Sequence, residues 1–308
     1  MGYGDKLMAI GDAWRDYQKD PRKRHVAIGN GRKIDMTDAE LGLGLDFLAS
    51  QDEVDRGDEV AWVISYPGWR PYHDHAAMRE ALRQQRSGSW LGRFRSNRDI
   101  GKLDHFIFNF EYQATPAPIR LTAEEQSLAE QWSREPFIAI EPYIKAKAPP
   151  SKQWPVERFA EVARRLQRDF KVYQIGAPDA PPLLEGLPRI RARSFREAMA
   201  YLRAARLFIG PEGGLHHASA AMGTRAVVIY GGYTSPRVTG YAFHVNLTGG
   251  SVEPCGTKHG FCAHCRAALD NISVDEVELN ARKLLSEPDR RSFEALRPAL
   301  DVVATSPL

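Results

Sequence analysis

A glycine-rich turn that carries an acid and two histidines is the stretch of this sequence best suited to chemistry. It runs Gly210-Pro211-Glu212-Gly213-Gly214-Leu215-His216-His217-Ala218-Ser219. An apolar strand is expected before the turn and a helix of small residues after it, so backbone N–H groups at the helix start would form an anion site for a diphosphate. Glu212 can orient a ligand hydroxyl, and a histidine can donate to a phosphate oxygen. The plain alternative is a tight turn with a histidine pair on the surface.

A lysine in a proline-containing loop is the second candidate for binding an anion. It lies in the run Ser151-Lys152-Gln153-Trp154-Pro155, directly before a predicted helix. From this place Lys152 can reach phosphates as a mobile point charge, while Trp154 and Pro155 anchor the loop and the helix start. Lys145 and Lys147 have weaker positional support, and a solvated lysine is the alternative.

The first residues offer a carboxylate at the start of a helix. Gly2-Tyr3-Gly4-Asp5 is followed by apolar residues at helical spacing, which predicts a tight turn into a helix. Asp5 is then either a general base or a plain N-cap. Such a turn normally follows a buried strand, for which this sequence has no residues, so the natural N-terminus either is this turn or lies upstream.

Three cysteines cluster late in the chain. Cys255, Cys262 and Cys265, with His259 and His264 among them, are of the types that bind zinc in tetrahedral sites. A second matched Cys pair is missing, so buried reduced thiols are the default expectation and a structural zinc ion the alternative.

Strand-like and helical patterns alternate along most of the chain, which predicts an α/β protein with parallel sheets. In the first part, strands are expected near 24–28, 60–65 and 104–110, and helices from about Asp5, about Asp74 and over 122–132. In the second part, strands are expected at 137–140, 171–175, 207–209 and 226–230, with helices from 155, 194, 216 and 273. The polar run before residue 137 marks the domain junction.

Length and composition exclude several classes of protein. A chain of 308 residues suits two domains, and the net charge of +3 with interspersed acids and bases is no nucleic-acid signature. We find no apolar run that could span a bilayer, no signal peptide, and too few cysteines for a disulfide scaffold. A cytoplasmic protein is expected.

These motifs together resemble glycosyltransferase family 9, which includes the heptosyltransferases of lipopolysaccharide synthesis. Glu212, Gly214 and His217 match the family's Asp-x-Gly-x-x-His signature, with Glu in place of Asp. Lys152-Gln153-Trp154-Pro155 matches its Lys-x-Trp-Pro motif, Gly4-Asp5 its N-terminal Gly-Asp, and residues 231–237 its Gly-x-Thr-x-Pro loop. The similarity covers residues 120–285, whereas residues 30–120 match by pattern only.

The resemblance implies a GT-B fold, in which two Rossmann-like domains face one another across a cleft. Residues 1–134 would form the acceptor domain, residues 135–285 the nucleotide-sugar domain, and residues 286–308 a tail packing back on the first domain. The implied reaction is an inverting, metal-independent transfer of a sugar, such as a heptose, to a glycan or lipid-linked glycan. Asp5 would be the base and Lys152 would stabilise the leaving diphosphate. The implied donor site is made of Lys152, Gly176, Glu212, Gly213, Gly214 and His217.

Other functions stay open on the sequence alone. A sugar-nucleotide epimerase and a non-catalytic sugar-nucleotide-binding protein would keep the same turn. A transferase acting on modified DNA would need a basic groove, for which Arg93, Arg95 and Arg98 are the candidates, but a solvated loop is the commoner explanation of such a patch. We expect no nucleic-acid partner, no required cofactor and, at most, peripheral contact at the inner face of a membrane. If Asp5 is not the base, His73, Asp74 and His75 are the next candidates.

Overall fold

The computed structural model describes residues 2–21, 24–28, 34, 39–64, 108, 110–144, 148, 150–251, 253–256 and 262–288. Helices and strands alternate over this part of the chain, and all strand pairs are parallel. In chain order the elements are α1 (Tyr3–Tyr17), β1 (Arg24–Ile28), α2 (Ala39–Gly42), α3 (Gln51–Asp55), β2 (Val60–Ile64), α6 (Ala123–Ser133), β3 (Phe137–Ile140), η2 (Pro150–Lys152), α7 (Val156–Leu166), β4 (Lys171–Gly176), β5 (Arg189–Arg191), α8 (Phe195–Ala204), β6 (Leu207–Pro211), α9 (Gly214–Ala221), β7 (Ala226–Ile229), α10 (Pro236–Thr239), β8 (Val245–Leu247), α11 (Ala263–Asn271) and α12 (Val274–Ser286).

The larger sheet has the strand order of a doubly wound fold. Its six strands are arranged β5-β4-β3-β6-β7-β8, so the chain starts in the middle, moves to one edge, and returns to build the other half. The order reverses between β3 and β6, and ligands of such sheets bind at the carboxyl ends of the strands beside this point. The loops after β3 and β6 are therefore where a site is expected.

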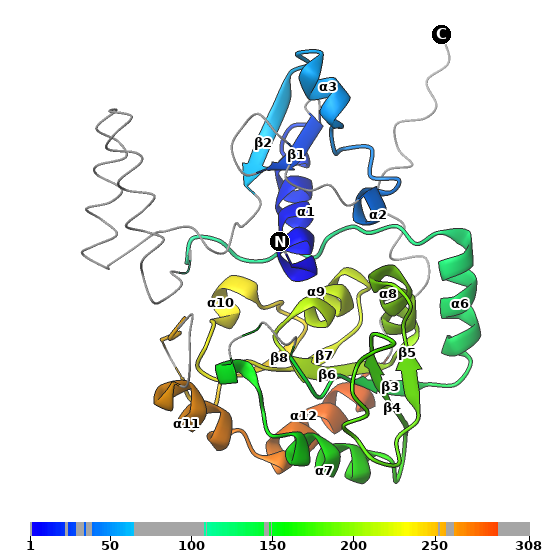
Figure 1. Ribbon diagram of the computed structural model, residues 1–308, viewed down its shortest axis with the longest axis vertical. Coiled ribbons are helices and arrows are strands. Elements are labelled where there is room, and N and C mark those ends of the chain that lie inside the picture. The colour runs from blue at the N-terminus through cyan, green and yellow to red at the C-terminus, as the bar shows by residue number, and fades with distance from the viewer. Residues whose placement is uncertain are drawn as a thin grey trace.

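Two apolar layers cover the two faces of this sheet because side chains alternate along each strand. Phe137 and Ala139 of β3 belong to a core with α8 and α9, whereas Ile138 and Ile140 belong to a core with α7, α11 and α12. Figure 1 shows α8 and α9 on one side of the sheet and α7, α11 and α12 on the other. Both faces of the sheet are therefore buried, which explains why its central strands are continuous apolar runs.

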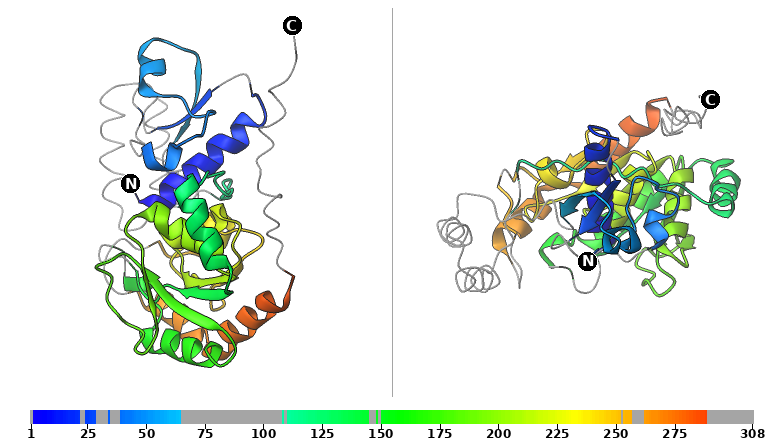
Figure 2. Two further views of the ribbon diagram at one scale, coloured as in Figure 1. Left: turned by 90° about the vertical axis from the view of Figure 1, so that its right-hand side faces the viewer. Right: turned by 90° about the horizontal axis from the view of Figure 1, so that it is seen from above.

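Helix α1 joins the two parts of the molecule. Its first turn lies against α9, and its far end lies beside the two-stranded sheet of β1 and β2 (Figures 1 and 2). Residues 110–122 cross beneath α1: the amide of Ala114 donates to the carbonyl of Val238 at 2.9 Å, and Tyr112 Oη donates to the carbonyl of Met8 at 3.2 Å. This segment therefore connects α1 to α10.

The predicted elements of the second part are confirmed, with small corrections at their ends. The helix predicted from His216 begins at Gly214, and Pro155 is the N-cap of α7, whereas the sequence placed it in the first helical turn. In the first part, the strands predicted near 24–28 and 60–65 are β1 and β2. The strand predicted near 104–110 lies mostly outside the described residues, and Phe108 and Phe110 are not in a strand.

Several predictions fall on residues that the structure does not describe. These are the helix near Asp74, the alternative bases and the arginine patch of the first part, the two lysines of the 141–153 loop, and residues 289–308 of the proposed tail: His73, His75, Arg93, Arg95, Arg98, Lys145 and Lys147. Among the described helices, none is long and apolar enough to cross a membrane.

Candidate functional site

Glu212 is the centre of a buried charged network at the end of β6. It follows the last residue of that strand, its side chain is 7% exposed, and its carboxylate pairs with the ammonium group of Lys152. Its other oxygen, Oε1, lies 3.4 Å from Nε2 of His217. Burial alone would raise the pKa of Glu212, but Lys152 and then His217 outweigh it and hold the pKa below the ordinary value. Glu212 is therefore a carboxylate.

Both histidines of the turn are buried, so the alternative of a histidine pair on the surface is wrong. His217 lies in the first turn of α9, where Nδ1 is 2.8 Å from the hydroxyl of Tyr241. It can donate from Nε2 to Glu212 while Nδ1 accepts from Tyr241. His216 is 0% exposed, and burial, followed by the charges of His217 and His244, keeps its pKa well below the ordinary value. His216 is therefore neutral and part of the packing.

Lys152 is held at the site by its loop and is not a solvated lysine. Its side chain is 14% exposed, and Nζ lies 5.2 Å from the ring centroid of Tyr233. The neighbouring Trp154 is fully buried, packs edge-on against Phe159 and donates from Nε1 to the carbonyl of Ile272 at 3.2 Å. The predicted anchoring role of Trp154 is confirmed, and it explains why Lys152 is fixed next to Glu212.

The turn after β7 supplies Tyr233, which the sequence did not single out. Tyr233 is 2% exposed, and burial raises the pKa of its hydroxyl, with the charge of Glu212 as the next cause. The sequence signal for it was weak, because Tyr233 occupies a variable position of the loop at 231–237.

The start of α1 meets the start of α9 at this same place. A Cβ placed on Gly4 would lie 2.7 Å from Cδ2 of His217 and 3.7 Å from Cα of Gly214, so only a glycine allows this approach. The ring of Tyr3 stacks on Phe195 at 4.1 Å between centroids. Two motifs that are far apart in the sequence, one at Gly4 and one at Gly214, are therefore neighbours in the structure.

Asp5 has a capping role in this turn. Gly2 is the N-cap of α1, and Asp5, at the third helical position, accepts a hydrogen bond from the amide of Gly2 at 3.1 Å. The sequence-based alternative made Asp5 the N-cap itself. The N-cap is Gly2, and Asp5 caps the helix from the third helical position. Its carboxylate is half-buried and lies within electrostatic reach of Tyr233.

Glu141 is a second acid at the switch point, and the sequence analysis missed it. It directly follows β3, and its amide donates to the carbonyl of Ile209 at 2.9 Å. Burial raises the pKa of its carboxyl to about 8 against the lowering effect of Lys152. Its position was predictable, since the residue that follows a central strand lies at the ligand-binding edge.

The glycines predicted for donor binding occupy two different places. Gly213 is the N-cap of α9 and Gly214 its first residue, so the amides of this turn point to where an anion would bind. Gly176 ends β4, where an added Cβ would lie 2.6 Å from the hydroxyl oxygen of Tyr143. Gly176 makes room for Tyr143, and its contact with a donor stays a prediction.

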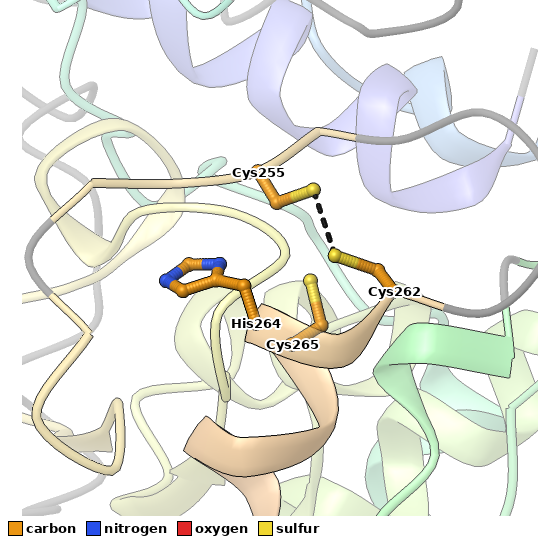
Figure 3. A group of neighbouring side chains, drawn as sticks. All are labelled: Cys255, Cys262, His264 and Cys265. Carbon is orange, nitrogen blue, oxygen red and sulfur yellow. Dashed lines mark hydrogen bonds between the residues drawn. The ribbon is translucent and has the colours of Figure 1, made fainter.

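The cysteine candidates lie together beyond the turn of Tyr233. Cys255, Cys262 and Cys265 are close to one another and to His264, while His259 lies outside the described residues. The structure thus brings four of the five metal candidates named from the sequence into one group (Figure 3).

Comparison with known proteins gives one family and several similar structures. The model of glycosyltransferase family 9 (heptosyltransferase) matches residues 97–268, which are 172 of the 308 residues. A comparison with curated protein sequences finds no significant match.

Two solved structures resemble the chain over nearly its whole length. A glycosyl transferase family 9 protein from Veillonella parvula DSM 2008 is 14% identical, with a TM-score of 0.59 over 92% of this chain and 95% of the other. The iron-containing dodecameric glycosyltransferase TibC from enterotoxigenic E. coli H10407 is 15% identical, with a TM-score of 0.54 over 92% of this chain and 73% of the other. With the parallel sheets described above, these likenesses show a GT-B-like α/β fold.

Proposed function

We propose that this chain, which belongs to glycosyltransferase family 9, transfers a sugar such as a heptose from a nucleoside-diphosphate donor to a hydroxyl acceptor. That it is a glycosyltransferase follows from the family, while the donor, the stereochemistry and the acceptor are the proposed parts. The acceptor would be a glycan or a lipid-linked glycan. With a lipid-linked acceptor, contact with a membrane would be peripheral.

The observation that carries the proposal is the meeting of four segments around Glu212. Lys152 comes from η2, His217 from α9 and Tyr233 from the turn after β7, and the first turn of α1, which carries Asp5, meets His217 at Gly4. A diphosphate at the start of α9 would accept hydrogen bonds from the amides of that turn and lie beside the ammonium of Lys152. Glu212, buried and ionised, would then accept hydrogen bonds from the sugar hydroxyls.

The proposed reaction is a single displacement at the anomeric carbon. The carboxylate of Asp5 takes the proton of the acceptor hydroxyl, the acceptor oxygen bonds to the anomeric carbon, and the bond from that carbon to the diphosphate oxygen breaks. The electron pair leaves with the nucleoside diphosphate, and the configuration inverts. The ammonium of Lys152 and the amides of Gly213 and Gly214 stabilise the negative charge that develops on the leaving diphosphate. The proposed transfer step therefore uses no metal ion.

A ligand screen tests the proposal. Unfolding temperature is measured with a panel of nucleoside diphosphates and their sugars, since a ligand that binds only the native state stabilises it in proportion to ln(1 + [L]/Kd). We expect one diphosphate and its sugar to stand out, with nucleoside monophosphates weaker. No shift from any member of the panel would overturn the donor assignment.

The second arm of this experiment separates transfer from the alternatives. The donor that stands out is incubated with the protein alone, and its sugar is analysed for isomerisation. Transfer predicts an unchanged sugar until an acceptor hydroxyl is supplied. An isomerised sugar would establish an epimerase, and a bound donor that reacts with no member of an acceptor panel would favour a binding protein.

A further inference from the structure

The group of Cys255, Cys262, His264 and Cys265 has the ligand set of a tetrahedral metal site. One ligand atom from each of the four residues can be chosen so that all lie within 4.8 Å of one another. Two sulfurs on one tetrahedral zinc ion are about 3.8 Å apart, so small side-chain movements would bring the four atoms onto one ion. Figure 3 shows the three sulfurs turned toward one another, with the imidazole beside them.

The backbone around two of the cysteines is arranged as in metal-binding turns. Cys262 is the N-cap of α11, so it lies at the N-terminal end of that helix. Cys255 is followed by Gly256, whose φ of 62° lies in the left-handed region that favours glycine. The N-terminus of α11 favours a negative charge on the sulfur of Cys262, and a thiolate is the form of cysteine that binds a metal ion.

The histidine is held with one ring nitrogen ready for a metal. Nε2 of His264 lies 3.1 Å from Oγ of Ser251, and that hydroxyl itself donates to the carbonyl of Glu253 at 3.2 Å. Ser251 therefore accepts the proton of Nε2, which leaves the lone pair on Nδ1. Histidines that bind metals are oriented by such a partner on the other nitrogen.

A disulfide explains this group less well than a metal ion does. The sulfurs of Cys255 and Cys262 are 3.1 Å apart, none of the three cysteines is in a disulfide, and Cys265 is fully buried against them. One disulfide would leave the third thiol and the oriented imidazole without a role. The sequence favoured reduced thiols because it shows no second Cys pair, but the fold brings Cys255 and His264 to the missing positions.

The same group holds the turn that carries Tyr233. The amide of Cys255 donates to the carbonyl of Gly232 at 2.8 Å, and the amide of Gly256 donates to the carbonyl of Tyr233 at 2.9 Å. A Cβ placed on Gly232 would lie 2.9 Å from Cε1 of His264 and 3.2 Å from Cα of Cys265. The turn is thus pressed against the cysteine group on one side, while the ammonium of Lys152 lies over the ring of Tyr233 on the other.

We propose that Cys255, Cys262, His264 and Cys265 bind one thiophilic metal ion, of which zinc fits the ligand set, and that this ion positions the Tyr233 turn beside the donor site. Binding replaces the thiol protons, which pass to solvent, and changes no oxidation state. The exposed side of His264 is the path by which the ion arrives. The positioning step rests on the proposed function, whereas the metal site does not.

Metal content tests the site without reference to activity. The full chain is produced with zinc and iron in the medium, and both metals are measured by mass spectrometry. We expect about one ion per chain, lost in the Cys262→Ser/Cys265→Ser double variant and kept in Ala267→Ser, an exposed change on the same helix. If the double variant does not fold, the wild-type chain is stripped with a chelator and titrated with Co²⁺, where thiolate-to-cobalt absorption and intense tetrahedral bands are expected.

Specific results would overturn the site. A folded wild-type chain with neither metal nor a cobalt spectrum would do so, as would metal that remains in the double variant or a Cys255–Cys262 disulfide found by peptide mapping. The oriented histidine gives a finer measurement, since Ser251→Ala should weaken cobalt binding by about tenfold. Unchanged affinity in that variant would remove His264 from the ligand set.

The positioning step is tested by nucleotide binding. Affinity for the nucleoside diphosphate that stands out in the screen is measured by calorimetry on metal-loaded and stripped chains, and we expect the stripped chain to bind more weakly. Equal affinity would overturn the positioning step. Failure of the proposed function would instead show as no diphosphate binding in a chain that still holds its metal.

Discussion

At the scale of single residues, the site depends on neighbours that keep the buried side chain of Glu212 ionised. Glu212 is buried and would be costly to ionise alone, but the ammonium of Lys152 and the imidazole of His217 compensate the charge. A buried ion pair stabilises little by itself, although removing one partner leaves an uncompensated charge. This arrangement suits a site that exchanges an internal partner for the phosphates of a ligand.

Replacing Lys152 with alanine should weaken binding of the nucleoside diphosphate by about ten- to a hundredfold, because a charge-assisted hydrogen bond contributes about 1.5–3 kcal/mol. Calorimetry measures the dissociation constant of the nucleoside diphosphate in each variant. The control is Lys171→Ala, which removes an exposed lysine that pairs with Glu135 and is the first residue of β4, at the opposite end of the strand from the ligand-binding edge. Equal affinities in the two variants would return Lys152 to a structural role.

Asp5→Asn should separate the base from the cap. The amide oxygen of asparagine can still accept the hydrogen bond from the amide of Gly2, so we expect the melting temperature and donor affinity to change little. Loss of a general base should lower turnover by about 10²–10⁴-fold. The measurement is kcat with saturating donor and acceptor, and a fully active variant would limit Asp5 to capping.

Glu141 makes stability depend on pH. Because its pKa is raised to about 8 by burial, the folded protein keeps this proton in a range where the unfolded chain, with an ordinary pKa of about 4.3, has lost it. The free energy of unfolding therefore falls as pH rises toward 8. Denaturant unfolding between pH 7 and 9, above the titration of unfolded histidines, should show a smaller decline in Glu141→Gln. Identical slopes would contradict the buried environment.

At the scale of elements, α1 is placed by close backbone contacts on both sides. Gly4 faces His217, and Gly11 faces the residues that cross beneath the helix: an added Cβ on Gly11 would lie 2.0 Å from the carbonyl oxygen of Thr115. Arg15 ties the same segment by donating to the carbonyl of Gln113 at 3.0 Å. Since Asp5 lies on this helix, its position at the site depends on these contacts.

Gly11→Ala should therefore destabilise the protein, against the usual trend in helices. In a helix interior, replacing glycine with alanine normally raises the free energy of unfolding by about 1 kcal/mol. Here the added Cβ clashes with a backbone atom, so we expect the free energy of unfolding to fall by about 1–3 kcal/mol instead. Gly42→Ala is the control, because its added Cβ meets only a side-chain atom, Cδ1 of Leu48, at 3.7 Å. Chemical denaturation measures both, and equal stability would show that the segment moves without cost.

At the scale of the whole molecule, α6 packs with the second part although it precedes the proposed boundary at 134. Arg196 of α8 is 5% exposed and donates from Nε to Oε1 of Glu125 at 2.8 Å and from Nη2 to Oε2 at 2.6 Å. Nη2 also reaches the carbonyl of Arg120 at 2.6 Å. The packing therefore favours a second domain that begins near residue 120.

Glu125→Gln tests this docking of α6. The variant keeps an acceptor for the capping box but removes the negative charge that faces the buried guanidinium of Arg196, so we expect a loss of about 3 kcal/mol in the free energy of unfolding. Glu161→Gln, which affects ion pairs on the solvent side of α7, should lower the free energy of unfolding much less, because water screens such pairs. Similar losses in both would make the Arg196 pair an ordinary surface interaction.

The sequence by itself determined the local pieces of this protein. The apolar runs at β3, β4, β6 and β7 and the spacing in α7 predicted their elements, because burying a strand or one helix face leaves a period in the chain. The glycine turn at 210–219 and the Lys-x-Trp-Pro run identified most of the donor site. These signals are local, so they need no knowledge of what lies opposite.

Only the tertiary structure decided which distant residues meet. It paired Lys152 with Glu212, placed Gly4 against His217, brought Glu141 to the switch point and gathered Cys255 with His264. Sequence spacing does not encode these contacts, because they depend on strand order and helix packing between segments far apart in the chain. The charge state of each acid follows the same rule. Glu141 and Glu212 both follow a central strand and Lys152 lowers the pKa of both, but only Glu212 pairs directly with Lys152 and has His217 beside it, so Glu212 is the stronger acid.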